Sequence, residues 1–282
     1  MTLTTSSLLI GLNLNEVFEV LRKLTLLLLL ATGCSQNPVV ETDINQLVVR
    51  GVLSPEFDHQ TILVEQGTNI LLTDGLKQSE LAKPVEEAVV IVNSDGREVV
   101  FQEVAPGEYQ DIATPLNVEP GKTYSLRIQD KQGHQLSAKT TVPGHFEIVL
   151  PIEGASYLPS QQIEFKWQPS PHVGIYAIGL VLPEECAYRF DEERRQFNFV
   201  QTTKNTETSI PFVNSCAADQ SALRYWRVVA YDSAFAAYQF GFFLFGDNRP
   251  RDSNIEGGLG VFGSMVSDSV TVVAVDTSSA SE

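Results

Sequence analysis

The sequence predicts an all-β protein made of two antiparallel β-sandwich domains that follow an N-terminal signal peptide. Short runs rich in β-branched and aromatic residues recur along the chain, with turn residues between them. Within several runs apolar and polar residues alternate, which is the period of a strand with one buried face. A third observation, an apolar segment directly before Cys34, predicts export of the chain.

Residues 1–33 are interpreted as the signal peptide. Arg22 and Lys23 precede Leu24–Thr32, an apolar run that ends in small residues before a cysteine. A helix over this run would rise about 14 Å, which is too short to cross a hydrocarbon core of about 30 Å. The run is therefore not expected to be a permanent membrane span. Residues 1–20 have no role in such a signal, so translation is expected to start nearer the basic pair.

Residues 31–34, Ala-Thr-Gly-Cys, resemble the lipobox of bacterial lipoproteins, although the lipobox usually has leucine where this chain has Ala31. The resemblance implies cleavage before Cys34 and acylation of that cysteine. Acyl chains contribute about 0.8 kcal/mol per buried methylene, so two or three of them would hold the protein at a membrane. Ser35, in place of an aspartate, implies sorting to the outer membrane, with the facing side left open. Residues 34–45 are expected to form a polar, lipidated tether.

The composition restricts the classes of partner. The formal net charge is -16, and such a surface repels phosphate backbones, so nucleic acid is not expected to bind. The apolar content of 43% is sufficient for packed cores. The simplest role of the acidity is solubility.

Cys186 and Cys216 remain as an even pair once Cys34 is assigned to lipid. In an exported protein such a pair is expected to form a disulfide. The bridge would close a loop of about 31 residues and stabilise the fold by roughly 3 to 4 kcal/mol. A metal site is the alternative, but all four histidines lie outside this interval.

Residues 46–143 are expected to form the first sandwich. Tyr124, Leu126 and Ile128 alternate with polar residues, as in a strand with one buried face. Residues 88–142 resemble the immunoglobulin-like modules of many exported proteins, in which residues 107–109, Gly-Glu-Tyr, would open a strand. The expected strands are the runs LVVRGVL, TILVEQ, AVVIVN, EVVFQEV, TYSLRIQ and SAKTTV.

Residues 144–282 are expected to form the second sandwich. Ile163, Phe165 and Trp167 alternate with charged residues, and Trp226 lies in a later apolar run. This arrangement resembles fibronectin type III domains over roughly residues 146–233. Residues 184–216 contain both cysteines of the pair and are interpreted as a disulfide-stapled insert. The last strand is expected at residues 269–275.

Residues 234–245 are dense in aromatic side chains. An extended chain here would be apolar on both faces, which fits a strand buried on both sides or a strand that meets a partner. Both interpretations stay open. The expected partner surface consists of Tyr238, Phe240, Phe242, Phe243 and Phe245.

Three patterns suggest chemistry, and each has a simpler explanation. Residues 258–263 formally match a dinucleotide fingerprint, but the strand–helix context is missing and a glycine-rich turn before a strand is favoured. Oxygen donors at residues 247–256 do not follow EF-hand spacing, so an ordinary loop is favoured over calcium binding. Carboxylates at residues 184–193 lie beside two arginines, so a solvated charge run is favoured over a glycosidase pair. No catalytic, cofactor or metal residues are predicted, and the chain is not expected to be an enzyme.

Together, the lipobox, the first module and residues 254–264 (NIEGGLGVFGS) resemble an uncharacterised family of Bacteroidetes-type surface lipoproteins of unknown function. Its members often accompany TonB-dependent receptors, which implies an accessory role in ligand capture. The leading hypothesis is therefore a noncatalytic outer-membrane lipoprotein that binds a ligand or partner. A structural or adhesive envelope protein is the alternative, and a hydrolase is a third hypothesis that would need convergent catalytic groups.

Overall fold

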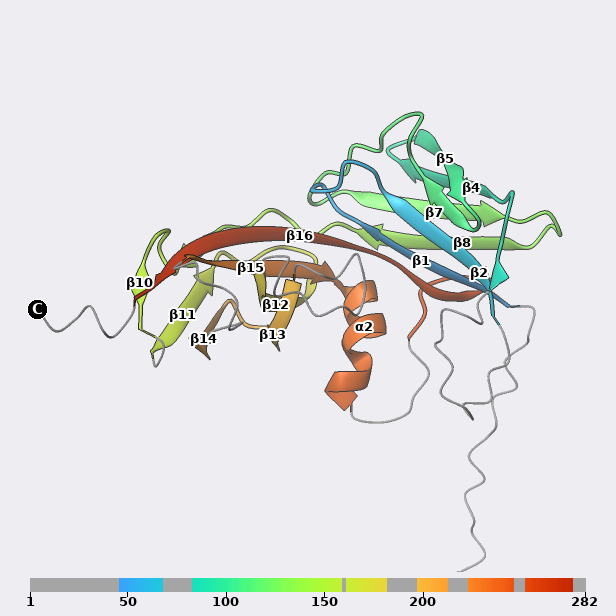
Figure 1. The fold of residues 1–282 in the computed structure, drawn as a ribbon. Helices are drawn as coiled ribbons and strands as arrows, with labels where there is room; N and C mark the ends of the chain where they lie inside the picture. The colour runs from blue at the N-terminus through green and yellow to red at the C-terminus, as the bar shows by residue number, and fades with distance from the viewer. Residues whose placement is uncertain are drawn as a thin grey trace, which may run out of the picture. The chain divides into compact units, whose positions relative to one another are not determined.

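The computed structural model describes residues 46–67, 83–158, 161–181, 197–212, 223–245 and 252–275, except for the side chains of residues 197–199 and 241–245 (Figure 1). All of these residues belong to one compact unit, Asp43–Glu282. Most of them lie in strands, which confirms the predicted all-β class. No helix in the described part has the length and apolar character required to span a membrane.

The first group of strands forms two sheets around one core. One sheet has the order β1-β2-β6, with β3 on β2, and the other has the order β5-β4-β7-β8. β5 pairs with both β6 and β4 and so makes the two layers continuous, and the pairing of β1 with β16 extends them into one 13-stranded sheet of the described residues. The strands are β1 (Leu47–Leu53), β2 (Thr61–Gln66), β3 (Lys83–Pro84), β4 (Val89–Ser94), β5 (Arg97–Ala105), β6 (Glu108–Gln110), β7 (Thr123–Gln129) and β8 (Gln135–Thr141).

Alternating apolar residues explain why these runs form strands that pack face to face. In β7 the side chains of Tyr124, Leu126 and Ile128 are buried while their neighbours are not, as the sequence predicts. They share one hydrophobic cluster with buried residues of β1, β2, β4, β5 and β8. The predicted strand after Gly107 is confirmed as β6.

The side chain of Tyr124 forms hydrogen bonds with the backbone of the segment that precedes β7. Its hydroxyl donates to the carbonyl of Asn117 at 2.9 Å and accepts from the backbone N–H of Glu119 at 2.8 Å. A tyrosine near the start of a strand that bonds the backbone a few residues upstream is the tyrosine corner of immunoglobulin-like sandwiches. Burial raises the pKa of this hydroxyl, which keeps it protonated and able to donate.

The second group of strands also forms two sheets around a core. A sheet of order β14-β11-β9 packs against a sheet of order β13-β12-β15-β16, with β10 on β16. Trp167 and Trp226 are buried between them, as the sequence predicts. The strands are β9 (Ile148–Leu150), β10 (Ser156–Tyr157), β11 (Gln162–Trp167), β12 (Val173–Val181), β13 (Phe197–Thr203), β14 (Glu207–Pro211), β15 (Leu223–Asp232) and β16 (Leu259–Ala274).

β16 pairs with strands of both groups. Its first part, Leu259–Ser264, runs parallel to β1, and its later part, Met265–Val273, runs antiparallel to β15 (Figure 1). The predicted last strand at residues 269–275 therefore began too late, because the glycine-rich segment itself forms the first part of the strand. The segment continues as a strand to Ala274 instead of leading into a helix, so the strand–helix context of a dinucleotide site is missing.

Glycine at position 260 is required by close backbone contact. Gly260 has a φ of 110°, and a Cβ built on it would lie 1.9 Å from the carbonyl oxygen of Val49. A side chain at this position would push β16 away from β1. The glycines that resembled a nucleotide motif thus permit strand pairing.

Residues 233–245 form a helix, α2 (Ser233–Phe245), so the predicted strand was wrong. Asp232 caps the helix, since its Oδ1 accepts the backbone N–H of Phe235 at 2.9 Å. Ala236 and Phe240 pack on β12 and β15 in a separate apolar cluster. Apolar residues surround the helix axis, so the sequence shows no amphipathic period, and the cap was the signal that the strand prediction overlooked.

Candidate functional site

The residues predicted to carry covalent modifications lie outside the described part of the structure. These are the lipidation site Cys34 and the expected disulfide pair, Cys186 and Cys216. The insert at residues 184–216 is described only over residues 197–212, where it forms β13 and β14. Its carboxylate run, residues 184–193, also lies outside the description.

The predicted aromatic surface is only partly placed. Phe240 is 8% exposed and belongs to the apolar cluster beneath helix α2, where its ring centroid lies 5.7 Å from that of Tyr231. Tyr238 is half-buried. The side chains of Phe242, Phe243 and Phe245 lie outside the description. The structure thus places one of these aromatic residues in the core.

The loop considered for calcium uses Asn254 to hold the backbone. The Asn254 side chain donates to the carbonyl of Phe262 at 2.8 Å and accepts the N–H of the same residue at 2.9 Å. Asp247 and Asn248 lie outside the description. In the described ranges, His, Cys, Asp and Glu side chains form no group of three or more that could hold a metal ion.

The outward face of the sheet β5-β4-β7-β8 is a candidate binding surface that the sequence analysis did not single out. One row of residues crosses it in register: Val100, Ile91, Arg127 and Ser137, one from each strand. Glu256 extends the row, because it bridges to Ser137 beyond β8. Val100 is 56% exposed, so this row presents apolar surface next to charged groups.

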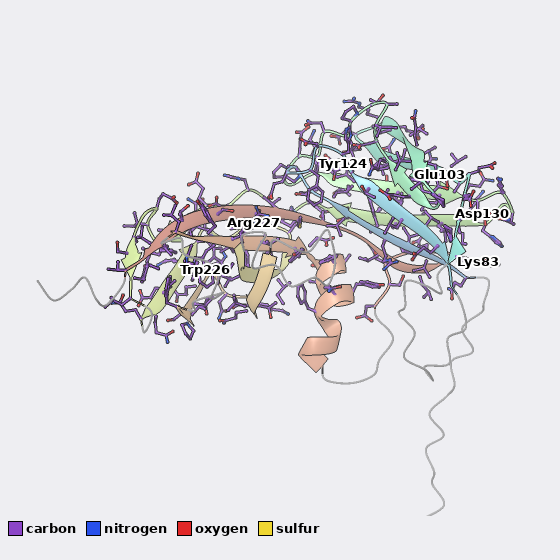
Figure 2. All side chains as sticks on the ribbon, viewed as in Figure 1. Lys83, Glu103, Tyr124, Asp130, Trp226 and Arg227 are labelled. Carbon is purple, nitrogen blue, oxygen red and sulfur yellow. The ribbon has the colours of Figure 1, made fainter. Side chains whose placement is uncertain are left out.

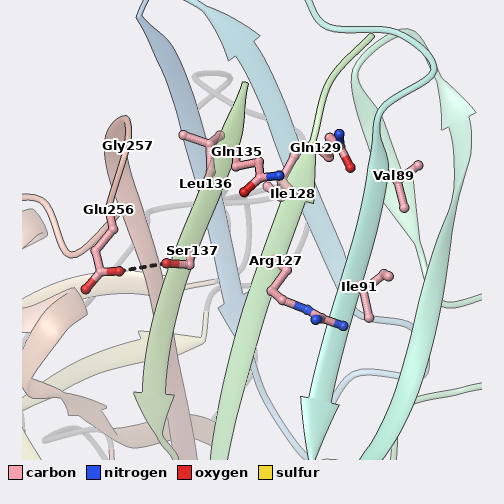
Figure 3. A pocket seen from close by; sticks show the side chains of 10 residues that line it. All are labelled: Val89, Ile91, Arg127, Ile128, Gln129, Gln135, Leu136, Ser137, Glu256 and Gly257. Carbon is pink, nitrogen blue, oxygen red and sulfur yellow. Dashed lines mark hydrogen bonds between the residues drawn. The ribbon is translucent and has the colours of Figure 1, made fainter. Parts of the chain in front are cut away.

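A pocket of about 530 Å³ opens on this face (Figure 3). A second row, Val89, Gln129 and Gln135, provides part of its wall, and Val89 is 53% exposed. Ligand pockets commonly have this size and combine apolar walls with a few polar groups. The lining residues are Val89, Ile91, Arg127, Ile128, Gln129, Gln135, Leu136, Ser137, Glu256 and Gly257.

The two charged side chains of the pocket differ in their partners. Arg127 forms an ion pair with Glu98. Glu256 accepts a hydrogen bond from the Ser137 hydroxyl at 2.8 Å (Figure 3). The pocket therefore offers a neutralised guanidinium, a carboxylate and two amides around an apolar wall. These groups suit non-covalent binding of a partner.

In the sequence, the only signal of this surface is an apolar residue at a strand position where the alternation of apolar and polar residues predicts a polar one. Val89, Ile91 and Val100 occupy outward positions of β4 and β5, between the core-facing residues Val90, Val92, Val99 and Phe101. An apolar residue at an outward position is a weak signal, because single exposed apolar residues are common. The register of three strand pairs is what gathers these residues into one patch.

Among the residues that the structure describes, two carboxylates have clearly shifted pKa values, and both are held by hydrogen bonds within the fold. Burial raises the pKa of Asp232 above its usual range, although Thr140 and the backbone of Phe235 donate to it. Burial also acts on Asp130, labelled in Figure 2, but the hydrogen bonds from His134 outweigh it and lower the pKa. Neither carboxylate lines the pocket.

Several solved structures are similar to this chain in architecture. They include the fibronectin(III)-like modules of Clostridium thermocellum CbhA, with 10% identity, TM-score 0.25, and coverage of 83% of this chain and 98% of that chain. The four N-terminal immunoglobulin domains of Dscam1 have 9% identity, TM-score 0.21, and coverage of 69% and 38%. A Bacteroides ovatus protein from a mixed-linkage glucan utilization locus, solved with a heptasaccharide, has 10% identity, TM-score 0.18, and coverage of 83% and 61%. At such TM-scores nothing about ligands carries over to this chain.

A search of the curated proteins finds no match. A family model, the domain of unknown function DUF4249, matches residues 35–271. The match spans both groups of strands and most of the shared strand β16. It also agrees with the expectation of an uncharacterised family. The chain therefore belongs to the DUF4249 family.

Proposed function

We propose that this chain is a noncatalytic lipoprotein of the bacterial outer membrane that binds a partner protein through the outward face of β5-β4-β7-β8. The observation that carries the proposal is the pocket on that face, with exposed Val89 and Val100 beside it. A TonB-dependent receptor is the partner class that the sequence resemblance suggests. Anchorage rests on Cys34 and the apolar run before it.

The composition of the face supports protein binding. Protein interfaces have an apolar centre and a polar rim, and here Val89, Ile91 and Val100 lie among Arg127, Gln129 and other polar residues. The lining groups of the pocket are aliphatic, amide, hydroxyl and charged side chains and one glycine. This composition favours an extended polypeptide over a flat ring as the bound group.

Membrane fractionation and intact mass test the anchor. The native protein is expected in the membrane fraction with the added mass of its acyl chains, and Cys34→Ala is expected to be soluble or unprocessed. Identical behaviour of the two proteins would remove the lipoprotein part of the proposal.

Site-specific crosslinking tests the binding face. A photo-crosslinking residue at Val100 in the full-length protein is expected to capture a discrete envelope protein, identified by mass spectrometry. The same residue at Glu164, an exposed position on β11, is the control and is expected to capture none. Equal capture at both positions, or none at Val100, would contradict partner binding at this face.

A structural role as a spacer is the second candidate. The observation that favours it is β16, because one continuous strand pairs with β1 and with β15. Backbone pairing on both sides would resist bending between the two groups of strands. A spacer needs no partner at Val100, so the crosslinking experiment separates the two candidates.

A further inference from the structure

Glu256 is held at the edge of the binding face by three hydrogen bonds to one residue. Its backbone N–H donates to the carbonyl of Ser137 at 2.8 Å, and its carbonyl accepts the N–H of Ser137 at 3.1 Å. Its carboxylate accepts the Ser137 hydroxyl at 2.8 Å. The exposed carboxylate is thus fixed next to β8, on the rim of the pocket (Figure 3).

The carboxylate of Glu256 forms no ion pair with a basic side chain in the described part of the chain. The other charged residue of the pocket, Arg127, is paired with Glu98. Glu256 is therefore the charged side chain of the pocket lining that has no oppositely charged partner. The net charge of -16 adds a long-range attraction for cationic groups.

We infer that this pocket binds a lysine side chain of an extended, basic polypeptide segment, with the ammonium group at Glu256. The inference rests on the proposed function and specifies its partner. The methylene stem of a lysine suits the apolar wall formed by Val89 and Ile91, whose side chains point outward from β4. The amides of Gln129 and Gln135 can donate to and accept from the backbone of such a segment. A second copy of this chain is disfavoured as occupant, because two copies of equal negative charge repel each other.

Fluorescence anisotropy with a matched set of peptides tests the inference. The probe is acetyl-Thr-Val-Lys-Val-Thr-amide with a fluorescent label, and the competitor has norleucine, which keeps the stem and removes the charge. The native protein in detergent is expected to bind the lysine peptide at least tenfold more tightly at low salt. The preference should decline with added salt.

Two variants assign the preference to the pocket. Glu256→Gln keeps an acceptor for Ser137 and is expected to reduce the preference to about onefold, because the amide carries no charge. Glu164→Gln makes the same charge change on β11, away from the pocket, and is expected to keep the tenfold preference. Thermal unfolding of both variants checks that they fold.

Three results would overturn the inference: no binding of the lysine peptide at millimolar concentration, equal binding of both peptides, or a preference that survives Glu256→Gln. Capture of an envelope protein at Val100 together with any of these results would leave the proposed function standing and remove only the lysine site. Loss of capture at Val100 would count against the proposed function itself.

Discussion

The hydroxyl of Thr140 donates to Oδ2 of Asp232 at 2.6 Å, and this bond joins β8 to the last residue of β15, which caps helix α2. The other carboxylate oxygen of Asp232 accepts the backbone N–H of Phe235. Ser264, on β16, lies 2.7 Å from the Thr140 hydroxyl oxygen. All three side chains are buried, so one polar network connects β8, the helix and the shared strand.

Replacing Asp232 with alanine is expected to lower the free energy of unfolding by about 3 kcal/mol. The change removes a helix cap, worth about 1 kcal/mol, and leaves the buried Thr140 hydroxyl without this acceptor. Urea unfolding measures the loss. Asp58→Ala, at an exposed position, is the control and is expected to change stability by less than about 0.5 kcal/mol. Equal effects of the two changes would contradict the network.

The raised pKa of Asp232 predicts a pH dependence of stability. Because burial makes the folded-state pKa higher than the unfolded value near 3.8, the folded state binds more protons between the two values. This contribution is fully present below the unfolded pKa and is lost as the pH rises through the folded pKa. The stability of the native protein relative to Asp232→Asn is therefore expected to increase as the pH falls from 7 to 4. A flat difference in urea unfolding over this range would contradict the shift.

Gly260→Ala is expected to destabilise the protein by more than about 3 kcal/mol, since the new methyl group would overlap the carbonyl of Val49. Gly121→Ala is the matched control. Gly121 also has a positive φ, 81°, but a Cβ there meets nothing within 4 Å. Its substitution is expected to cost about 1 kcal/mol from backbone strain alone. Urea unfolding of both variants would show similar losses if the contact between β1 and β16 were unimportant.

Tyr124→Phe is expected to cost about 2 kcal/mol, because the carbonyl of Asn117 and the N–H of Glu119 lose their shared partner. Tyr225→Phe makes the same chemical change at a side chain that is 49% exposed and is expected to be nearly neutral. Thermal unfolding compares the two. A neutral Tyr124→Phe would show that the tyrosine corner does not stabilise this sandwich.

The alternation of apolar and polar residues predicted the strands well, because in a strand with one buried face every second residue is apolar. Alternation at Tyr124, Leu126 and Ile128 is enough to specify β7 and its buried face. The same reasoning failed for residues 233–245. Aromatic content favoured a strand, whereas the cap at Asp232 and packing of Phe240 on β12 and β15 produce a helix.

The sequence by itself determined the all-β class, most strand positions and the expectation of a lipidated Cys34. Only the tertiary structure decided that β16 begins at Leu259 and pairs with β1, since such pairing depends on residues more than two hundred positions apart. It also decided the binding face, where register brings Val100, Arg127 and Glu256 into one row. The sequence does not indicate which outward residues are neighbours across a sheet. Those neighbours are determined by strand pairing and not by distance along the chain.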